Sequence, residues 1–265
     1  MKIQEWRRLA LCSVGLLAAV LLVSLSGMLH PLADNNLPGE ENGTGTASER
    51  LQDIAHVEAH GRDENGPAVT QEPRRQYVVV IDAGHGGDDE GTGSTDWKYR
   101  EKDYALKVAD CLKEILDGTD IKAYYTRTDD REVSKEERVR LAKKVGADAL
   151  ISIHCNASDL NETTAKGVET LYSSRKATTK NGLSSKELAH NMLDAVCEMT
   201  GRQKRKVIRR DRLYLMHHAD MPVTIVEIGF MTNRSDMAYM KSEENQKAIA
   251  QGIYRGICTS FHLSE

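Results

Sequence analysis

Aromatic residues, paired cysteines and a strong excess of one charge are all lacking in this chain. Tryptophan, tyrosine and phenylalanine together make up 5% of its 265 residues, and the formal net charge is -4 at pH 7. Nucleic-acid binders need basic surfaces, and single-strand binders also need aromatic side chains that stack on bases. The composition therefore argues against a nucleic-acid partner. The hydrophobic content of 40% is still sufficient for a globular core.

The five cysteines stand far apart along the chain, and no two of them form a C-x-x-C pair. This spacing matches neither a zinc ribbon nor a disulfide framework. We therefore interpret them as unpaired, mostly buried small apolar residues. They are Cys12, Cys111, Cys155, Cys197 and Cys258.

A long segment without charged side chains lies near the N-terminus. Residues 9–29 are 21 consecutive apolar or small uncharged residues, and Lys2, Arg7 and Arg8 precede them. This length suffices to cross a bilayer as a helix, with the basic flank in the cytoplasm and the rest of the chain outside. Residues 1–33 are therefore predicted to be a signal anchor in the cytoplasmic membrane. The alternative is a cleaved signal peptide, which would yield a secreted protein.

The next segment, residues 34–75, is rich in Asn, Gly, Glu, Thr and Asp. Its few apolar residues are isolated, so it cannot bury enough surface to offset the entropy lost on ordering. We predict a flexible polar linker that lets a membrane-tethered domain move above the bilayer. The folded domain is predicted to occupy residues 76–265.

Within residues 76–265, short apolar runs alternate with amphipathic stretches. The pattern predicts a buried strand from residue 78 and further strands over 121–126, 149–154, 167–172 and 223–228. It predicts helices over 102–116, 134–144, 184–199 and 243–261. This alternation indicates an α/β fold with a twisted, mostly parallel sheet flanked by helices on both faces. The basic segment 202–212 is expected to be a solvated loop.

Three predicted strands end in side chains that can carry chemistry. His85 follows the first strand, His154 ends the strand 149–154, and Glu227 lies in the strand 223–228. A lone histidine at a strand end is more often structural than functional. Since functional groups gather beyond the carboxyl ends of strands in open α/β sheets, we expect the three residues to converge on one edge.

Glu101 is a fourth candidate, because it begins the predicted helix that follows the His85 loop. On its own it could be an acidic residue that interacts with the helix dipole. Two imidazoles and one carboxylate, with one coordination position left open, are typical of hydrolytic zinc sites. This donor set suits Zn²⁺ better than iron–sulfur or copper electron-transfer centres.

Four motifs occur in order along the predicted domain. They are DAGHGG at residues 82–87, a glutamate at 101 that opens a helix, SIHCNA at 152–157 and VEIGFMTN at 226–233. Together they closely resemble the zinc-dependent N-acetylmuramoyl-L-alanine amidases of the amidase-3 type, over essentially all of residues 77–262.

The resemblance implies the activity and the role of each site residue. It implies hydrolysis of the amide between N-acetylmuramic acid and L-alanine in bacterial peptidoglycan. It further implies that His85, Glu101 and His154 bind Zn²⁺ and that Glu227 is the catalytic carboxylate. The short anchor, linker and single catalytic domain also resemble the sporulation-linked cortex amidases. A requirement for an activator protein is left open.

Several neighbouring residues carry weaker hypotheses. Asp82 and Asn156 are candidates for orienting the ligand histidines, and ordinary turn or cap hydrogen bonds are the alternative. His217 and His218 are expected at the rim of the site. Cys155 is expected to be buried, on the side opposite to the ligands. If the basic segment lies near the site, it could hold stem-peptide carboxylates or anionic wall polymers.

Two other functions remain open from the residues alone. The first is another zinc metallopeptidase or carboxypeptidase that acts on cell-wall peptides, although the order of the motifs disfavours it. The second is a non-catalytic wall-binding regulator. Its mark would be the loss of a ligand or of Glu227, and all four residues are present.

Overall fold

The computed structural model describes residues 76–158, 164–177, 179 and 181–264. The predicted membrane segment 1–33 and the predicted linker 34–75 lie outside these residues. Among the described helices, none combines the length and the apolar character needed to cross a bilayer.

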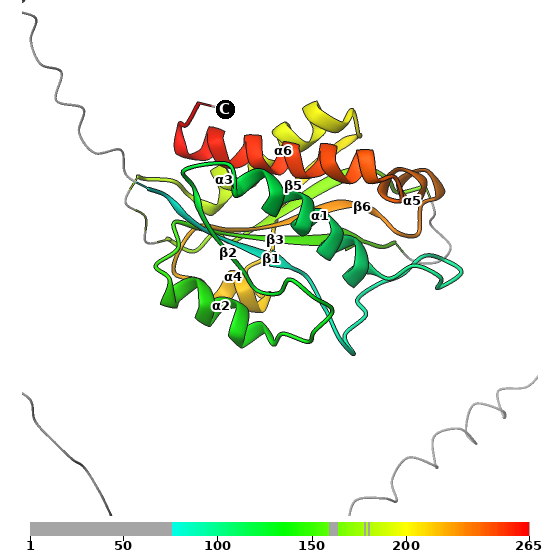
Figure 1. Ribbon diagram of the computed structural model, residues 1–265, viewed down its shortest axis with the longest axis horizontal. Coiled ribbons are helices and arrows are strands. Elements are labelled where there is room, and N and C mark those ends of the chain that lie inside the picture. The colour runs from blue at the N-terminus through cyan, green and yellow to red at the C-terminus, as the bar shows by residue number, and fades with distance from the viewer. Residues whose placement is uncertain (1–75, 159–163, 178, 180, 265) are drawn as a thin grey trace, which may run out of the picture. The chain divides into compact units, whose positions relative to one another are not determined.

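A six-stranded sheet with the order β2-β1-β3-β6-β4-β5 forms the centre of the fold (Figure 1). Four of the five neighbouring strand pairs are parallel, and only β4 and β6 pair antiparallel. The mostly parallel sheet is therefore confirmed, with β4 and β5 running against the other strands. The strands are β1 (Val78–Ala83), β2 (Lys122–Tyr125), β3 (Ala149–Asn156), β4 (Val168–Tyr172), β5 (Lys204–Arg209) and β6 (Val223–Phe230).

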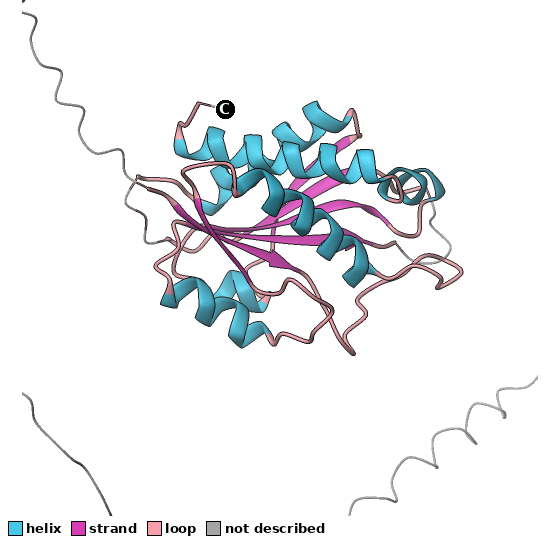
Figure 2. Ribbon diagram, in the orientation of Figure 1, coloured by secondary structure: helices cyan, strands magenta, loops and turns pink. Residues whose placement is uncertain are grey.

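Helices cover both faces of this sheet, as predicted (Figure 2). One face packs into a core built with α1 (Glu101–Leu116), α3 (Ser185–Thr200), α5 (Arg234–Met240) and α6 (Glu243–Phe261). The other face packs into a smaller core built with α2 (Lys135–Lys144) and α4 (Tyr214–His218).

The first strand shows why continuous apolar runs are needed here. Val79 and Ile81 belong to the larger core, whereas Val80 between them belongs to the smaller one. All three side chains are fully buried. Successive side chains of a strand point to opposite faces, so a strand covered on both sides must be apolar at every position.

The helix starts expected from capping residues are confirmed. The Ser134 hydroxyl accepts a hydrogen bond from the Glu137 amide, and the Glu137 side chain accepts one from the Ser134 amide, which completes a capping box at α2. Ser184 caps α3 through the Glu187 amide. These local hydrogen bonds satisfy amides that lack a partner within the helix.

The prediction of a loop over residues 202–212 is wrong in part, because the segment contains β5. This strand lies at the edge of the sheet, where only Val207 and Ile208 pack against the two cores. An edge strand with one open side can be basic, so it lacks the apolar run that marks a central strand. The helices α4 and α5 were also missed, since five and seven residues are too few for a clear helical period.

Candidate metal centre

His85 and His154 lie together with Glu101 near the carboxyl ends of β1 and β3, His85 just after β1 and His154 close to the end of β3. One ligand atom from each residue lies within 4.8 Å of the others. Glu101 stands between the two imidazoles, with Oε2 3.1 Å from Nε2 of His85 and Oε1 2.7 Å from Nδ1 of His154. The structure thus brings together the three residues that the sequence proposes as metal ligands, in an arrangement that can hold a metal ion.

The backbone that carries His85 is in an unusual conformation. Its φ angle is 59°, in the left-handed region that non-glycine residues rarely adopt. Such strain is retained where the surrounding structure over-determines it, and it is common at functional sites.

Two glycines provide the space in which the three side chains approach each other. A Cβ at Gly84 would lie 2.5 to 2.7 Å from three atoms of the His154 ring. A Cβ at Gly91 would lie 2.6 Å from Oε2 of Glu101 and 2.7 Å from Cδ2 of His85. Any larger residue at either position would push a candidate ligand out of place.

Glu101 is the first residue of α1 and is buried, with 4% of its surface exposed. The Thr92 amide donates to Oε2 at 2.8 Å, and the Cys155 amide donates to Oε1 at 3.0 Å. Burial raises the pKa of this carboxyl, but hydrogen bonds and charge from His154 and His85 outweigh it and hold the pKa well below its ordinary value. Glu101 is therefore an ionised carboxylate that suits a cation.

The contact between Glu101 and His154 shifts the pKa of His154 upward, opposite to its effect on Glu101. Burial lowers its pKa, but the hydrogen bond and the negative charge of Glu101 raise the pKa to about 9. The pocket therefore stabilises a positive charge on this side chain. A divalent ion would compete with that proton for the same site.

Asp89 orients His85, and sequence reasoning missed it. Its Oδ1 lies 2.8 Å from Nδ1 of His85 and also accepts the Gly91 amide at 3.2 Å. A carboxylate on Nδ1 fixes the ring and leaves Nε2 for a metal. Asp88, Asp89 and Glu90 follow one another in the sequence, so nothing in the sequence singles out the middle residue.

Asp82 does not hydrogen-bond to either ligand histidine among the described contacts. Its fully buried carboxylate accepts hydrogen bonds from Thr126 Oγ1 at 2.7 Å and Ser152 Oγ at 2.6 Å, and it pairs with Arg138. The proposed direct orienting role is therefore replaced by one that acts through Arg138.

Two buried arginines hold the backbone of the His85 loop. Arg138 donates from Nη1 to the Ala83 carbonyl at 2.7 Å and from Nη2 to the His85 carbonyl at 2.8 Å. Arg127 donates from Nε to the Ala83 carbonyl at 3.0 Å and from Nη2 to the Gly84 carbonyl at 2.7 Å. The loop beyond β1 is thereby fixed by side chains that come from other parts of the chain.

Glu227 faces His154 in register across β6 and β3. Its Oε2 atom is buried and has no hydrogen-bond partner within the described part of the chain. Burial raises the pKa of Glu227 to about 7; the charges of Glu101 and Glu169 add to this effect, while His154 opposes it. A carboxyl with a pKa near neutrality can both accept and return a proton.

Among the described contacts, Asn156 forms no hydrogen bond with either histidine and instead binds Glu169. Its Nδ2 donates to Oε2 of Glu169 at 3.0 Å, and Arg205 donates from Nε to Oε1 of Glu169 at 2.6 Å. Glu169 stands opposite Glu227 in the antiparallel pair of β4 and β6. Sequence reasoning missed both Glu169 and Arg205, although a charged residue inside the apolar strand 167–172 was a usable signal.

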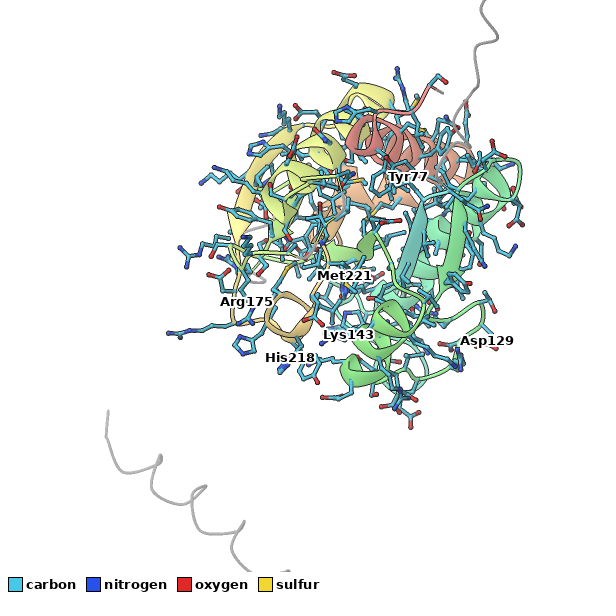
Figure 3. The ribbon with its side chains drawn as sticks, turned by 90° about the vertical axis from the view of Figure 1, so that its left-hand side faces the viewer. Tyr77, Asp129, Lys143, Arg175, His218 and Met221 are labelled. Atoms are coloured by element: carbon cyan, nitrogen blue, oxygen red, sulfur yellow. The ribbon has the colours of Figure 1, made fainter. Side chains whose placement is uncertain are left out.

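The remaining expectations concern the surroundings of the cluster. Cys155 is buried in the larger core, as predicted, and burial raises the pKa of its thiol. His217 and His218 lie exposed on α4, and Figure 3 shows His218 at the surface. A cavity of about 150 Å³ is lined by His85, His154 and the start of α4, so α4 borders the site.

Comparisons with known proteins identify the family of this chain. The family described as N-acetylmuramoyl-L-alanine amidase (Amidase_3) matches residues 79–259. The uncharacterized protein YqiI of Bacillus subtilis is 33% identical over 190 residues, which are 72% of this chain and 87% of that protein.

Two solved structures extend the likeness to the fold. An N-acetylmuramoyl-L-alanine amidase from Clostridium difficile 630 is 34% identical, with a TM-score of 0.65 over 72% of this chain and 99% of that one. The CwlD amidase from Clostridioides difficile, solved in complex with the GerS lipoprotein, is 27% identical, with a TM-score of 0.64 over 71% of this chain and 99% of that one. The chain belongs to the Amidase_3 family of N-acetylmuramoyl-L-alanine amidases.

Proposed function

We propose that this protein hydrolyses the amide bond between N-acetylmuramic acid and L-alanine in peptidoglycan, with Zn²⁺ held by His85, Glu101 and His154. The observation that carries the proposal is the His–Glu–His cluster of a family member, with Glu227 on the adjacent strand, whose Oε2 atom has no hydrogen-bond partner among the described residues. A metal-binding cluster together with a proton carrier is what amide hydrolysis requires.

The donor set fits zinc. One ionised carboxylate and two imidazoles supply three ligands and leave a position for water or substrate. When bound, the ion supplies Lewis acidity toward the water and the substrate carbonyl. Asp89 holds the His85 ring, and the amides of Thr92 and Cys155 hold the Glu101 carboxylate.

Glu227 moves the proton. Its carboxylate takes a proton from the attacking water and later returns one to the nitrogen of the departing peptide. The pKa of about 7 suits both steps, because the group gains and loses a proton near neutral pH. The hydrogen bonds from Asn156 and Arg205 hold Glu169 beside it in a fixed position.

The test uses the purified full-length chain with purified peptidoglycan, before and after chelation and after zinc is returned, with products identified by mass spectrometry. Release of stem peptides that begin with L-alanine, lost on chelation and restored by zinc, is the expected result. Cuts within the peptide would instead identify a metallopeptidase. Stoichiometric zinc binding without any cleavage would favour the wall-binding regulator or a missing activator.

We also propose that residues 1–33 tether the protein to the cytoplasmic membrane, with the catalytic domain outside the cell membrane. The support is the uncharged segment 9–29 behind a basic flank. Extraction of membranes at high pH tests it, since an anchored chain stays in the pellet. Recovery of a shortened chain in the medium would indicate a cleaved signal peptide.

A partner protein that activates the enzyme is a further proposal, supported by the CwlD structure, which contains a lipoprotein partner. It predicts that the purified chain hydrolyses peptidoglycan faster when a membrane extract of the cells that produce it is added.

A role in sporulation, suggested by the arrangement of anchor, linker and catalytic domain, predicts that the chain is made only in sporulating cells. Immunoblotting through growth and sporulation tests that timing.

A further inference from the structure

The cavity of about 150 Å³ beside the metal centre lies on the face of the sheet that α2 and α4 cover (Figure 1). His85 and His154 form one part of its wall, and residues at the starts of α2 and α4 form most of the rest. The cavity is smaller than the pockets that hold a whole small-molecule ligand. It therefore suits one segment of a larger substrate.

The position of Ile225 indicates which part of the substrate can reach this cavity. Ile225 lines the cavity and lies two residues before Glu227 on β6. Side chains two residues apart on a strand point to the same face, so Glu227 faces the side on which the cavity lies. In the proposed reaction Glu227 returns a proton to the nitrogen of the departing peptide. The stem peptide, which begins at that nitrogen, therefore extends along this face of the sheet.

Apart from the two histidines, four residues of the cavity wall have a charged side chain: Asp82, Asp89, Lys135 and Arg138. Asp82 pairs with Arg138, and Asp89 pairs with His85. The exposed Lys135 side chain forms neither an ion pair nor a hydrogen bond with any residue that the structure describes. Its charge is therefore left for a ligand in the cavity.

The stability of α2 does not explain a lysine at this position. Lys135 is the first residue of α2, and the first turn of a helix favours acidic side chains because of the helix dipole. Glu136 and Glu137 follow it and are of that favourable kind. A cation at residue 135 gains nothing from the dipole, which is consistent with a role toward a ligand.

Apolar side chains form another part of the wall. Val133 precedes α2, and Leu213 and Leu215 lie at the start of α4. Leu213 has 39% of its surface exposed, so it offers apolar area that a ligand can cover. An apolar wall that contains one free cation suits a segment with a methyl group and a carboxylate.

We propose that Lys135 binds the free α-carboxylate of the second stem-peptide residue, while the methyl group of L-alanine lies against the apolar wall. The inference rests on the proposed function and adds how the departing peptide is recognised. An extended chain spans at most about 3.6 Å per residue, so this carboxylate lies within roughly two residue lengths of the scissile nitrogen. A cavity of about 150 Å³ has a similar extent, and its wall includes both histidines and Lys135.

The test is an equilibrium binding measurement that needs no turnover. The probe is L-alanyl-D-isoglutamyl-L-lysine with an amidated C-terminus and a fluorophore on the lysine side chain, so the α-carboxylate of its second residue is its single carboxylate. The comparison peptide has a carboxamide at that position. The zinc-loaded full-length chain is expected to bind the carboxylate peptide about fivefold more tightly, as one exposed charge pair allows. Lys135→Gln is expected to lose this preference.

Lys144→Gln is the matched control. Lys144 is an exposed cation in the last turn of the same helix, it has no acidic partner in the described part of the chain, and it does not line the cavity. This variant is expected to keep the full preference. Both variants should retain their zinc and their thermal stability, which verifies that the fold is intact.

Three results would overturn the inference. The first is equal binding of both peptides by the unmodified chain, and the second is a loss of preference in K144Q as large as that in K135Q. The third concerns polyglycerol phosphate, which represents the phosphate-rich polymers of cell walls. If K135Q loses binding of this polymer but keeps its preference for the carboxylate peptide, the lysine serves the polymer.

Cleavage of peptidoglycan, measured separately, distinguishes a failure of this inference from a failure of the proposed function. If the chain prefers the carboxylate peptide yet never cleaves peptidoglycan, the proposed function fails and the binding role of Lys135 stands. Cleavage by a chain that shows no preference for the carboxylate refutes the role of Lys135 alone.

Discussion

Glu227 and Glu169 stand directly opposite each other on the antiparallel strands β6 and β4. Hydrogen bonds from Asn156 and Arg205 satisfy the carboxylate of Glu169. The Oε2 atom of Glu227 receives no such bond from the described residues. Two adjacent carboxyls thus have different environments, and burial raises the pKa of Glu227 to about 7.

This difference predicts the behaviour of Glu227→Gln. The amide keeps the shape of the side chain but cannot carry the proton, so hydrolysis of peptidoglycan should fall about 100-fold or more. The zinc content should stay at one ion per chain, because Glu227 is not among the three proposed ligands. Reaction rates together with elemental analysis check both statements, and full activity in this variant would refute the proton-carrying role.

His85→Ala should instead remove the metal. The substitution deletes one of two imidazoles in the cluster, and the ionised Glu101 then shares the site with His154 alone. We expect substoichiometric zinc after dialysis, with little change in circular dichroism. Retention of one zinc ion per chain would refute the assignment of His85 as a ligand.

Asp89→Asn tests the group that orients His85. Loss of the carboxylate beside Nδ1 should weaken zinc binding about 10- to 100-fold, which is usual for a partner of a ligating histidine. Asp88→Asn is the matched control, because Asp88 is an exposed neighbour of the same charge. Competition with a fluorescent zinc chelator measures both affinities, and equal losses in the two variants would contradict the orienting role.

The Gly91→Ala variant tests the crowding around Glu101. Its Cβ would lie 2.6 Å from Oε2 of Glu101, so zinc affinity should fall together with stability. Gly146→Ala is the control, since Gly146 has a similar positive φ of 63° but no atom within 4 Å of the added Cβ. Both variants should lose about 1 kcal/mol of stability from the backbone conformation, but only Gly91→Ala should lose metal.

The pKa values predict how pH affects the metal-free and metal-loaded protein. The pKa of His154 is raised from 6.5 to about 9 in the folded chain, so its contribution to stability is complete below pH 6.5 and is lost as pH rises to 9. The metal-free protein should therefore become less stable across this window. Thermal unfolding at several pH values measures the trend, and a stability that rises with pH would contradict it.

Zinc binding should release a proton over the same window, because the ion needs a neutral His154. Titration calorimetry in buffers with different ionisation enthalpies counts the protons released. At pH 7 to 8 we expect at least one proton per zinc ion. A heat of binding that does not depend on the buffer would contradict this coupling.

Much of the fold could be predicted from the sequence because its signals are local. The apolar runs of β1, β3 and β6 mark strands buried on both faces, and Ser134 and Ser184 mark helix starts through hydrogen bonds to amides three residues away. The edge strand β5 could not be predicted. Its basic residues are tolerated because they find partners on other elements, such as Asp194 and Glu169.

The sequence by itself determined which residue types lie at the ends of the strands, and so it indicated His85, Glu101, His154 and Glu227 as candidates. Only the tertiary structure decided that Glu101 stands between the two imidazoles and that Asp89 contacts His85. The contacts of Glu101 join residues from a loop, a helix and a strand, whereas Asp89 and His85 share the loop after β1. Their distances depend on how the sheet and the buried arginines place the backbone, which no local pattern encodes.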